Sequence, residues 1–365
     1  MTISDKEIVV ISNEPWGEIW YSKQNYAFEL ARTNRVLFVN PCSKWKFSNL
    51  FRMRTEFKIV HPNLTVLTYT NLLPSLNKGL FLLNNFLISK KLKFALKKRG
   101  IEAFLFWNFD PHRLCTPAAM GAGLSVYHCV DKYDLRHYGE KYLCRNSDHI
   151  FIVSEEFRET YSKLNPSVSL LTHGISSDEF TRDDSPSTAA KDAILYVGNI
   201  DSRLDFELIE KALIQFPEER FVFVGKENLD PTNLFSKRIF TEKKYPNLIT
   251  TGPIHFKKLK NYIADSKCCI AFMSKEYNGN QISHHKIFLY LAHGKPVFSC
   301  VFTEYVSIRE LLYMNDDNRM TLTSLQQFLQ EGEADSLKEK RIIHASSHRF
   351  QAILERAGDL LYKHS

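Results

Sequence analysis

The sequence predicts an α/β protein built from two doubly wound, Rossmann-like parallel-sheet domains that face each other across a cleft. Short apolar runs recur along the whole chain, and each is followed by a stretch with helical spacing. The runs are continuous in Val, Ile, Leu and Phe, which is typical of parallel strands covered by helices on both faces. A polar segment at 181–193 carries Pro186 and interrupts this rhythm, so it indicates an interdomain linker.

Each apolar run is expected to form one strand. Before the linker, the expected strands lie at 8–12, 35–39, 64–68, 103–107, 125–130, 149–154 and 168–172. After it, they lie at 193–198, 221–225, 248–252, 268–272 and 296–300. We therefore expect an N-terminal domain at 1–182, a C-terminal domain at 192–345, and a C-terminal helix at 346–365 that packs back on the N-terminal domain.

The composition is that of a globular protein, with 44% hydrophobic and 24% charged residues. No stretch approaches the roughly 20 apolar residues that span a bilayer, and the first residues lack the apolar core of a signal peptide. The seven cysteines include no CxxC pair, which indicates reduced thiols and a cytoplasmic protein. Zinc-ligand spacing is absent, so no metal site is expected.

Several motifs with well-understood chemistry are missing from the sequence. There is no GxGxxG after the first expected strand, which argues against nicotinamide or flavin binding. A P-loop and a GxSxG nucleophile elbow are also absent. No DxD triplet follows a strand, which argues against a metal-dependent sugar transferase with a single domain.

The loop after the first expected strand reads NEPWGEIWYSKQN, residues 13–25. Ligands of open parallel sheets bind beyond the carboxyl ends of the strands, so this loop is a candidate binding segment. Gly17 can bring the backbone close to a ligand, and Trp16 and Trp20 can wall a pocket. A simple glycine turn with two tryptophans at the edge of the core explains the residues equally well.

The corresponding loop of the second domain reads VGNIDSRLDFELI, residues 197–209. Asp201 or Ser202 is expected to cap the following helix, which places Arg203 in the first helical turn. An arginine there opposes the helix dipole, so an anionic partner is favoured. The alternative is a salt bridge from Arg203 to Asp205 or Glu207.

A third candidate lies in QISHHKIFLYLAHGKPV, residues 281–297. Ser283 is a plausible cap for an apolar helix, and Lys286 then lies near its N-terminus, where free N–H groups attract anions. Arg203 and Lys286 are expected at the same sheet edge, and two cations there suit a diphosphate. Taken alone, a solvated lysine would be the simpler interpretation.

Six stretches occur in a characteristic order along the chain. They are SNEPWGEIWYSKQNYAFELAR near the start, YHCVDKYD (127–134), DHIFIVSEEF (148–157), THGISSDEF (172–180), YVGNIDSRLDFELI (196–209) and KIFLYLAHGKPV (286–297). Together they resemble GT-B-fold glycosyltransferases of family 4, in particular the branch similar to teichuronic-acid and other surface-polysaccharide transferases. Each stretch is weak by itself, whereas the ordered set is fairly specific.

The resemblance implies a hexosyltransferase that moves a sugar from a UDP-, GDP- or dTDP-linked donor to a lipid-linked glycan acceptor. It also implies retention of configuration and no need for a metal or another cofactor. Arg203 and Lys286 would hold the donor diphosphate in the C-terminal domain and stabilise the leaving group. Asp131 would line the acceptor side in the N-terminal domain and orient the acceptor hydroxyl or take its proton.

Further site residues are implied by the same resemblance. Trp16 and His173 would lie on the acceptor side, and His128 is a weaker candidate because it falls inside an expected strand. The donor-binding set would comprise Gly17, Gly198, Asn199, Arg203, Gly225, Ser283, Lys286 and Leu289.

One departure from the family pattern concerns the nucleotide ribose. The family carries a glutamate where this chain has Leu289, and Gln281 replaces an acidic residue eight positions earlier. A deoxyribose nucleotide as donor, substitution by Glu276, or a weak or inactive homologue would each explain it. A GT-B pyruvyl-type transferase and a non-catalytic binding protein are the alternative functions.

The basic residues are concentrated in one part of the chain. Residues 41–100 contain twelve lysines and arginines but only one acidic residue, Glu56. Within it, 79–100 has helical amphipathic spacing, with apolar Leu83, Phe86, Leu87, Leu92, Phe94 and Leu96 beside cationic Lys90, Lys91, Lys97 and Lys98. This pattern favours docking on an anionic membrane at the inner face of the plasma membrane. A solvated surface helix is the alternative, and no nucleic-acid-binding motif is present.

Overall fold

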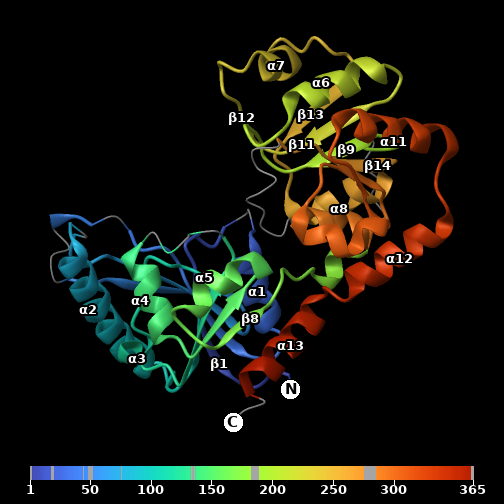
Figure 1. Ribbon diagram of the computed structural model, residues 1–365. Coiled ribbons are helices and arrows are strands. Elements are labelled where there is room, and N and C mark those ends of the chain that lie inside the picture. Colours follow the sequence, from blue (N-terminus) through green and yellow to red (C-terminus); the bar gives the residue numbers. More distant parts are fainter. Residues whose placement is uncertain are drawn as a thin grey trace. The chain divides into compact units, whose positions relative to one another are not determined.

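The structure, a computed structural model, describes residues 2–17, 20–43, 45–47, 52–74, 76–131, 133, 135, 137–181, 189–274 and 285–362, apart from the side chains of Phe256 and Lys257. It contains two compact units (Figure 1). The N-terminal unit comprises Met1–Gly174 and Phe350–Ser365, and the C-terminal unit comprises Ile175–Arg349. The units thus divide at Gly174 and Arg349, whereas the sequence analysis expected boundaries near 182 and 345.

An eight-stranded sheet forms the centre of the N-terminal unit. Its strands are β1 (Glu7–Ile11), β2 (Arg35–Val39), β3 (Thr55–His61), β4 (Leu64–Tyr69), β5 (Leu105–Asn108), β6 (Leu124–Cys129), β7 (His149–Ile152) and β8 (Val168–Leu170). Their spatial order is β3-β4-β2-β1-β5-β6-β7-β8, and β3 is the antiparallel edge strand. The sequence analysis missed β3 because its largely exposed side chains, TEFKIVH, form no continuous apolar run.

Helices flank this sheet and close the unit. They are α1 (Ser22–Leu30), α2 (Lys78–Lys97), α3 (Pro117–Met120), α4 (Tyr138–Asn146), the short turn η2 (Glu155–Phe157), α5 (Arg158–Ser162) and α13 (Phe350–Tyr362). The Phe350 ring of α13 meets the Tyr26 ring of α1 edge to face, with 4.9 Å between centroids. A Cβ on Gly174 would lie 2.6 Å from this phenylalanine, so only glycine fits where the chain leaves the unit.

The C-terminal unit has a six-stranded parallel sheet. Its order is β13-β11-β9-β14-β15-β16, from β9 (Ile194–Val197), β11 (Phe221–Val224), β13 (Leu248–Gly252), β14 (Cys268–Ala271), β15 (Val297–Ser299) and β16 (Tyr313–Met314). A two-stranded ribbon pairs β10 (Ile200–Asp201) with β12 (Glu227–Asn228). The helical segments are η3 (Ser177–Glu179), α6 (Phe206–Gln215), α7 (Leu234–Ser236), η4 (Lys237–Thr241), α8 (Phe256–Asp265), α10 (His285–Ala292), η5 (Thr303–Leu311), α11 (Asn318–Glu331) and α12 (Asp335–Ser346).

Both sheets reverse their strand order at one point. In the N-terminal unit β1 lies between β2 and β5, and in the C-terminal unit β9 lies between β11 and β14. Ligands of doubly wound sheets bind at the carboxyl ends of the strands beside such a switch point. The loops after β1 and β9 are therefore the places where each unit can hold a ligand.

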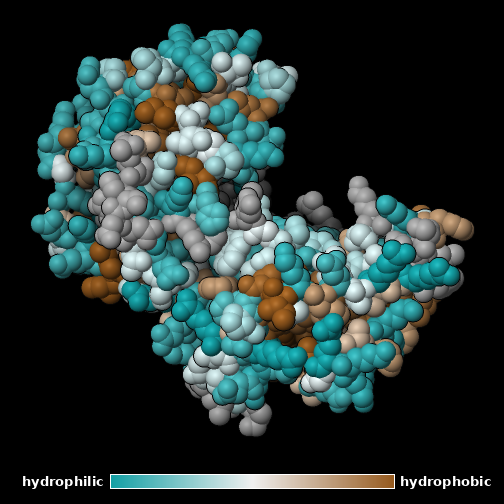
Figure 2. All heavy atoms as spheres, turned by 180° about the vertical axis from the view of Figure 1, so that it is seen from behind, coloured by the Kyte–Doolittle hydropathy of each residue, from teal (hydrophilic) through white to brown (hydrophobic). Residues whose placement is uncertain are grey.

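Hydrophilic side chains cover most of the face seen in Figure 2, and apolar side chains gather there in small patches. Within the residues that the structure describes, no helix is both long enough and apolar enough to cross a membrane.

Candidate functional site

Two glycine turns touch each other beyond the carboxyl ends of β9 and β11. Gly198 follows β9 with φ +142°, and Gly225 follows β11 with φ +157°, a backbone region that favours glycine. A Cβ on Gly225 would lie 1.8 Å from the carbonyl oxygen of Gly198, so no larger residue fits. The Gly198 N–H donates to the Val224 carbonyl at 2.9 Å and joins the two turns. Two of the three glycines expected in the donor site, Gly198 and Gly225, therefore meet at one edge of the sheet.

Arg203 lies in the loop that follows, beside β10. Its Nε and Nη2 donate to the two carboxylate oxygens of Asp201 at 2.8 and 2.7 Å. Burial alone would raise the pKa of Asp201, but hydrogen bonds from Arg203 hold that pKa below its usual value. Of the two explanations considered for Arg203, a salt bridge does exist, but its partner is Asp201 rather than Asp205 or Glu207.

The predicted start of helix α6 is wrong. Its N-cap is Asp205, whose carboxylate accepts from the Leu208 N–H at 2.8 Å, and neither Asp201 nor Ser202 caps it. Arg203 thus precedes the helix and does not belong to its first turn. Asp201 is unavailable as a cap because its carboxylate holds the arginine.

Lys286 is the second residue of α10. Its Nζ lies 3.2 Å from the Tyr196 hydroxyl and 4.4 Å from the centroid of the Tyr196 ring. Burial, reinforced by the positive charge of Arg203, lowers the pKa of Lys286 to about 7, although Asp201 acts in the opposite direction. The lysine therefore exchanges its proton near neutral pH and would gain from an anionic ligand.

The structure brings Arg203 and Lys286 to the same sheet edge as the glycine turns. A Cβ on Gly198 would lie 3.2 Å from the Lys286 Nζ, so this turn and the lysine are immediate neighbours. The sequence analysis missed Tyr196, which supports the lysine from within β9. An aromatic residue two positions before the glycine was the available signal, but it resembles any other core residue of a buried strand.

The other expected donor residues have different surroundings. Leu289 is buried in the hydrophobic core of the C-terminal unit. Asn199 is exposed, and its backbone carbonyl accepts the Tyr196 hydroxyl proton at 2.9 Å. Ser283, Gln281 and Glu276 lie outside the described residues.

In the N-terminal unit, Asp131 follows β6 and faces a buried lysine of α1. The Lys23 Nζ lies 3.2 Å from Glu14 and 3.5 Å from Asp131, and the Tyr133 hydroxyl donates to Asp131 at 3.3 Å. The side chain of Asp131 is about half exposed, with a fractional exposure of 47%. Its carboxylate is thus partly neutralised from one side and accessible from the other.

The remaining acceptor-side residues are spread over the same sheet edge. His173 is buried, and its Nδ1 lies 3.1 Å from the Ser22 hydroxyl. The backbone N–H of Trp16 donates to the Asn40 side-chain oxygen at 2.8 Å, and the Trp16 ring packs on the Trp20 ring with 5.0 Å between centroids. Gly17, which was expected in the donor-binding set, follows Trp16 in the same loop. A Cβ on Gly17 would meet no atom within 4 Å, so sterics alone do not require this glycine.

His128 is a core residue, as its strand position favoured. Trp107 Nε1 donates to its Nδ1 at 3.3 Å, and its Nε2 lies 3.2 Å from the Leu171 carbonyl. Burial lowers the pKa of this histidine to about 3, so it is neutral at physiological pH.

The sequence analysis also missed Arg113. Its guanidinium donates to Asp110 at 2.6 Å, to the Tyr69 hydroxyl at 2.8 Å, to the Asn40 carbonyl at 3.1 Å, and to the Ser12 carbonyl. These partners follow or end β5, β4, β2 and β1, so one arginine ties four strand ends together.

Sequence comparison finds one short relationship. No family model matches the chain. A curated relative of Bacillus subtilis (strain 168), named "Putative teichuronic acid biosynthesis glycosyltransferase TuaH", is 29% identical over 102 residues. The match covers 28% of this chain and 25% of the relative, about a quarter of the relative's length.

Solved structures align with nearly the whole chain. A trehalose-6-phosphate structure from E. coli, bound with UDP-2-fluoro glucose, has a TM-score of 0.69 at 12% identity and covers 98% of this chain and 99% of that chain. The N-terminal domain of Candida albicans trehalose-6-phosphate phosphatase has a TM-score of 0.69 at 13% identity, covering 100% and 98%. A UDP-forming α,α-trehalose-phosphate synthase from Burkholderia xenovorans, in complex with glucose-6-phosphate, has a TM-score of 0.70 at 9% identity, covering 98% and 100%. The chain has the GT-B fold. The fold class expected from the sequence is thereby confirmed.

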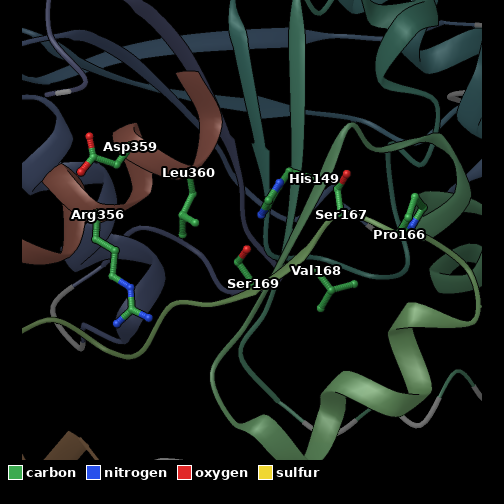
Figure 3. Close-up of a pocket in the computed structure, with 8 residues that line it drawn as sticks. All are labelled: His149, Pro166, Ser167, Val168, Ser169, Arg356, Asp359 and Leu360. Atoms are coloured by element: carbon green, nitrogen blue, oxygen red, sulfur yellow. The ribbon is translucent and has the colours of Figure 1, made fainter. Parts of the chain in front are cut away.

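A separate cavity of about 440 Å³ opens on the N-terminal GT-B unit (Figure 3). Side chains of α13 line one side of it, and His149 with the residues around β8 lines the other. His149 begins β7, so the cavity lies at the amino end of that strand and away from the edge where parallel sheets bind ligands. We do not place the donor or the acceptor there.

In the part of the chain that the structure describes, no group of three or more His, Cys, Asp and Glu side chains could hold a metal ion. The basic side chains of Arg203 and Lys286, beside the glycine turns, form the candidate site for a diphosphate.

Proposed function

We propose that this chain is a glycosyltransferase that moves a sugar from a nucleoside-diphosphate donor to a glycan acceptor in cell-surface polysaccharide synthesis. One observation carries the proposal: the Lys286 Nζ lies beside two close-packed glycine turns at the carboxyl end of β9, within the electrostatic influence of Arg203. The name of the Bacillus subtilis relative and the UDP-2-fluoro glucose of an aligned structure support the same chemistry.

The reaction needs charge stabilisation on the leaving group. The bond between the anomeric carbon and the diphosphate oxygen breaks, and the acceptor oxygen forms the new bond while its proton departs. Negative charge then grows on the departing nucleoside diphosphate, and two fixed cations stabilise it more in the transition state than in the bound donor. In this proposal Arg203 and Lys286 supply that charge without a metal, and the configuration is retained.

The acceptor side is proposed in the N-terminal unit, where Asp131 is the candidate base or orienting group. The Lys23 Nζ lies 3.5 Å from this carboxylate, and the exposed part of the Asp131 side chain can accept a hydroxyl proton or a hydrogen bond. Trp16 and His173 complete the proposed acceptor-side group.

Calorimetric titration with UDP, GDP, dTDP and CMP tests the donor class. We expect one nucleoside diphosphate to bind clearly more tightly than CMP, because two cations recognise the diphosphate. Equal binding of CMP would contradict recognition of the diphosphate by Arg203 and Lys286. If none of the four nucleotides binds, a non-catalytic protein is favoured. A parallel titration with a three-carbon phosphate donor tests the alternative, because tighter binding of that donor than of any nucleotide would favour a pyruvyl-type transferase.

We further propose that the acceptor is lipid-linked and that helix α2 docks the protein on an anionic membrane surface. This helix has two apolar faces. Phe81, Ile88, Leu92 and Leu96 are buried, whereas Leu83, Phe86 and Phe94 are exposed. Leu92 and Leu96, counted with the amphipathic set in the sequence analysis, therefore belong to the core.

The exposed face of α2 combines its apolar residues with lysines. The Lys90 Nζ lies 5.5 Å from the Phe86 ring centroid, and the Lys98 Nζ lies 4.5 Å from that of Phe94. A groove of about 470 Å³ runs beside this face and is lined by Met53, Thr55, Lys90, Lys91, Phe94, Ala95 and Lys98. The helix contains no acidic residue. Aromatic rings that insert at the interface and lysines that meet lipid phosphates suit an anionic bilayer.

Flotation with vesicles tests the docking surface. Each surface lysine contributes about 1 kcal/mol to binding an anionic membrane, so replacing Lys90, Lys91, Lys97 and Lys98 by Gln should abolish flotation. Phe86→Ser with Phe94→Ser should weaken it at constant charge. Replacing Lys226, Lys237, Lys243 and Lys244, exposed lysines of the C-terminal unit, by Gln is the charge-matched control. Equal binding to neutral and anionic vesicles, or equal loss in the control, would refute the surface.

A further inference from the structure

We propose that Tyr196 is a positioning residue that holds the Lys286 ammonium group in place for the donor diphosphate. The assignment rests on the proposed function and adds a residue to the proposed site. It also predicts how donor binding responds to pH.

The Tyr196 hydroxyl has a defined orientation. It donates its only proton to the Asn199 carbonyl at 2.9 Å, so its lone pairs remain for Lys286 Nζ at 3.2 Å. The ring adds a second attraction, because the ammonium group lies 4.4 Å from its centroid. Tyr196 is only 2% exposed and packs against Phe223 at 5.2 Å, so its side chain cannot easily move away.

The neighbouring glycine keeps this arrangement open. A Cβ on Gly198 would lie 2.9 Å from the Tyr196 hydroxyl and 3.2 Å from the Lys286 Nζ. A side chain at this position would therefore press on both groups. Because Gly198 has no side chain, a phosphate can approach its backbone beside the Lys286 ammonium group.

Among the residues that the structure describes, Arg203, Asp201 and Cys300 act electrostatically on Lys286. Arg203 repels it, whereas Asp201, on β10, and Cys300, after β15, favour its charged form. A bound diphosphate would add negative charge to this group and stabilise the ammonium form. Binding should then draw a proton from solution whenever Lys286 is partly neutral in the free protein.

The sign of the pH dependence follows directly. The pKa of Lys286 is about 7 in the free protein and is expected to be higher in the complex. Affinity should thus be highest near and below pH 7 and fall as pH rises, by at most about 10-fold per pH unit for one proton. Below about pH 6 the terminal phosphate of the nucleotide itself takes up a proton, so the useful window lies above that pH.

A buried tyrosine that merely fills the core is the simpler explanation, and Tyr290 provides the matched control. Tyr290 is fully buried in the same unit, and its hydroxyl accepts from the Val197 N–H at 2.8 Å. Tyr290→Phe therefore removes a buried hydroxyl without removing the support of the lysine.

Titration calorimetry with UDP, dTDP and inorganic pyrophosphate, from pH 6.5 to 9 in buffers of different ionisation enthalpy, tests the assignment. We expect wild-type protein to take up a proton on binding and Lys286→Arg to bind without pH dependence. Tyr196→Phe should lower affinity at pH 7 by about 2- to 10-fold, the value of one hydrogen bond, and shift the midpoint of the pH profile. Tyr290→Phe should leave profile and affinity unchanged.

The outcomes separate this assignment from the function on which it rests. If wild-type protein binds none of the three probes and does not bind GDP, the proposed donor site fails and the role of Tyr196 fails with it. If UDP or dTDP binds with a flat pH profile, or if Tyr196→Phe and Tyr290→Phe behave alike, the donor site stands and the positioning role is overturned. Proton uptake by the wild-type protein is a readout that holds even if Tyr196→Phe folds poorly.

Discussion

Asp201 holds Arg203 by a two-point ion pair, with Nε–Oδ1 and Nη2–Oδ2 distances of 2.8 and 2.7 Å. The backbone N–H of Arg203 also donates to the Asp201 carboxylate, at 3.1 Å. The pair fixes the plane of the guanidinium before any ligand arrives, so a diphosphate meets an arginine that has already lost most of its rotamer freedom.

Arg203→Met should weaken binding of UDP or dTDP by about 1.5–3 kcal/mol, the range for a hydrogen bond to a charged group. Arg238 offers a matched control, because its Nε donates to Glu210 at 2.7 Å in the same unit. Arg238→Met should lower stability and leave nucleotide affinity unchanged in calorimetry. Equal losses of affinity in both variants would show that Arg203 acts through the fold alone.

Gly198→Ala should impair nucleotide binding because its Cβ would crowd both Tyr196 and Lys286. Gly332→Ala is the comparison, since Gly332 also has positive φ, +73°, but a Cβ there would meet no atom within 4 Å. Both changes carry backbone strain of about 1–3 kcal/mol and should lower the melting temperature. Only Gly198→Ala should reduce UDP affinity, by more than about 10-fold if the clash moves Lys286. Unchanged UDP affinity of the Gly198→Ala protein would contradict the predicted crowding of Tyr196 and Lys286.

The N-terminal unit should lose stability in acid because His128 is buried in its neutral form. The pKa of His128 is about 3 in the folded chain and about 6.5 when unfolded, so the unfolded state alone binds the proton as pH falls between these values. Its contribution is complete above about pH 6.5 and falls by about 1.4 kcal/mol per pH unit below it.

The four tryptophans all lie in the N-terminal unit, at positions 16, 20, 45 and 107, so their fluorescence reports its unfolding. Urea unfolding at pH 7.5 and 5.5 should show a smaller pH dependence for His128→Asn than for wild-type protein. An identical pH dependence in the two proteins would assign the acid sensitivity to other groups.

Leu289 predicts weak discrimination at the nucleotide ribose. The side chain is buried among apolar neighbours and offers no acceptor for ribose hydroxyls. UDP and its 2′-deoxy analogue should therefore bind within about 3-fold of each other, whereas a charged hydrogen bond to the 2′-hydroxyl would favour UDP by more than 10-fold. A preference of that size would point to a carboxylate elsewhere, such as Glu276.

Local patterns in the sequence predicted most of the fold. Continuous apolar runs such as IVVIS and ILYV are typical of strands that are buried on both faces between helices. These runs therefore predicted the positions of the strands and their parallel pairing. Strand β3 was not predicted, because an exposed edge strand needs no continuous apolar run. The cap of α6 was misplaced because several residues before it could accept a backbone N–H, and the choice depended on which carboxylate already held Arg203.

Residue patterns along the chain were enough to predict glycine turns and two basic residues, Arg203 and Lys286, at the carboxyl edge of the second parallel sheet. How these groups are held depends on contacts that form only in the folded chain. Tyr196 supports Lys286 across 90 residues of chain, Asp201 fixes Arg203, and Leu92 and Leu96 turn inward while Phe86 and Phe94 face outward on one helix. Such contacts join residues through space, and their free energy depends on burial and on neighbouring charge, which spacing along the chain does not encode.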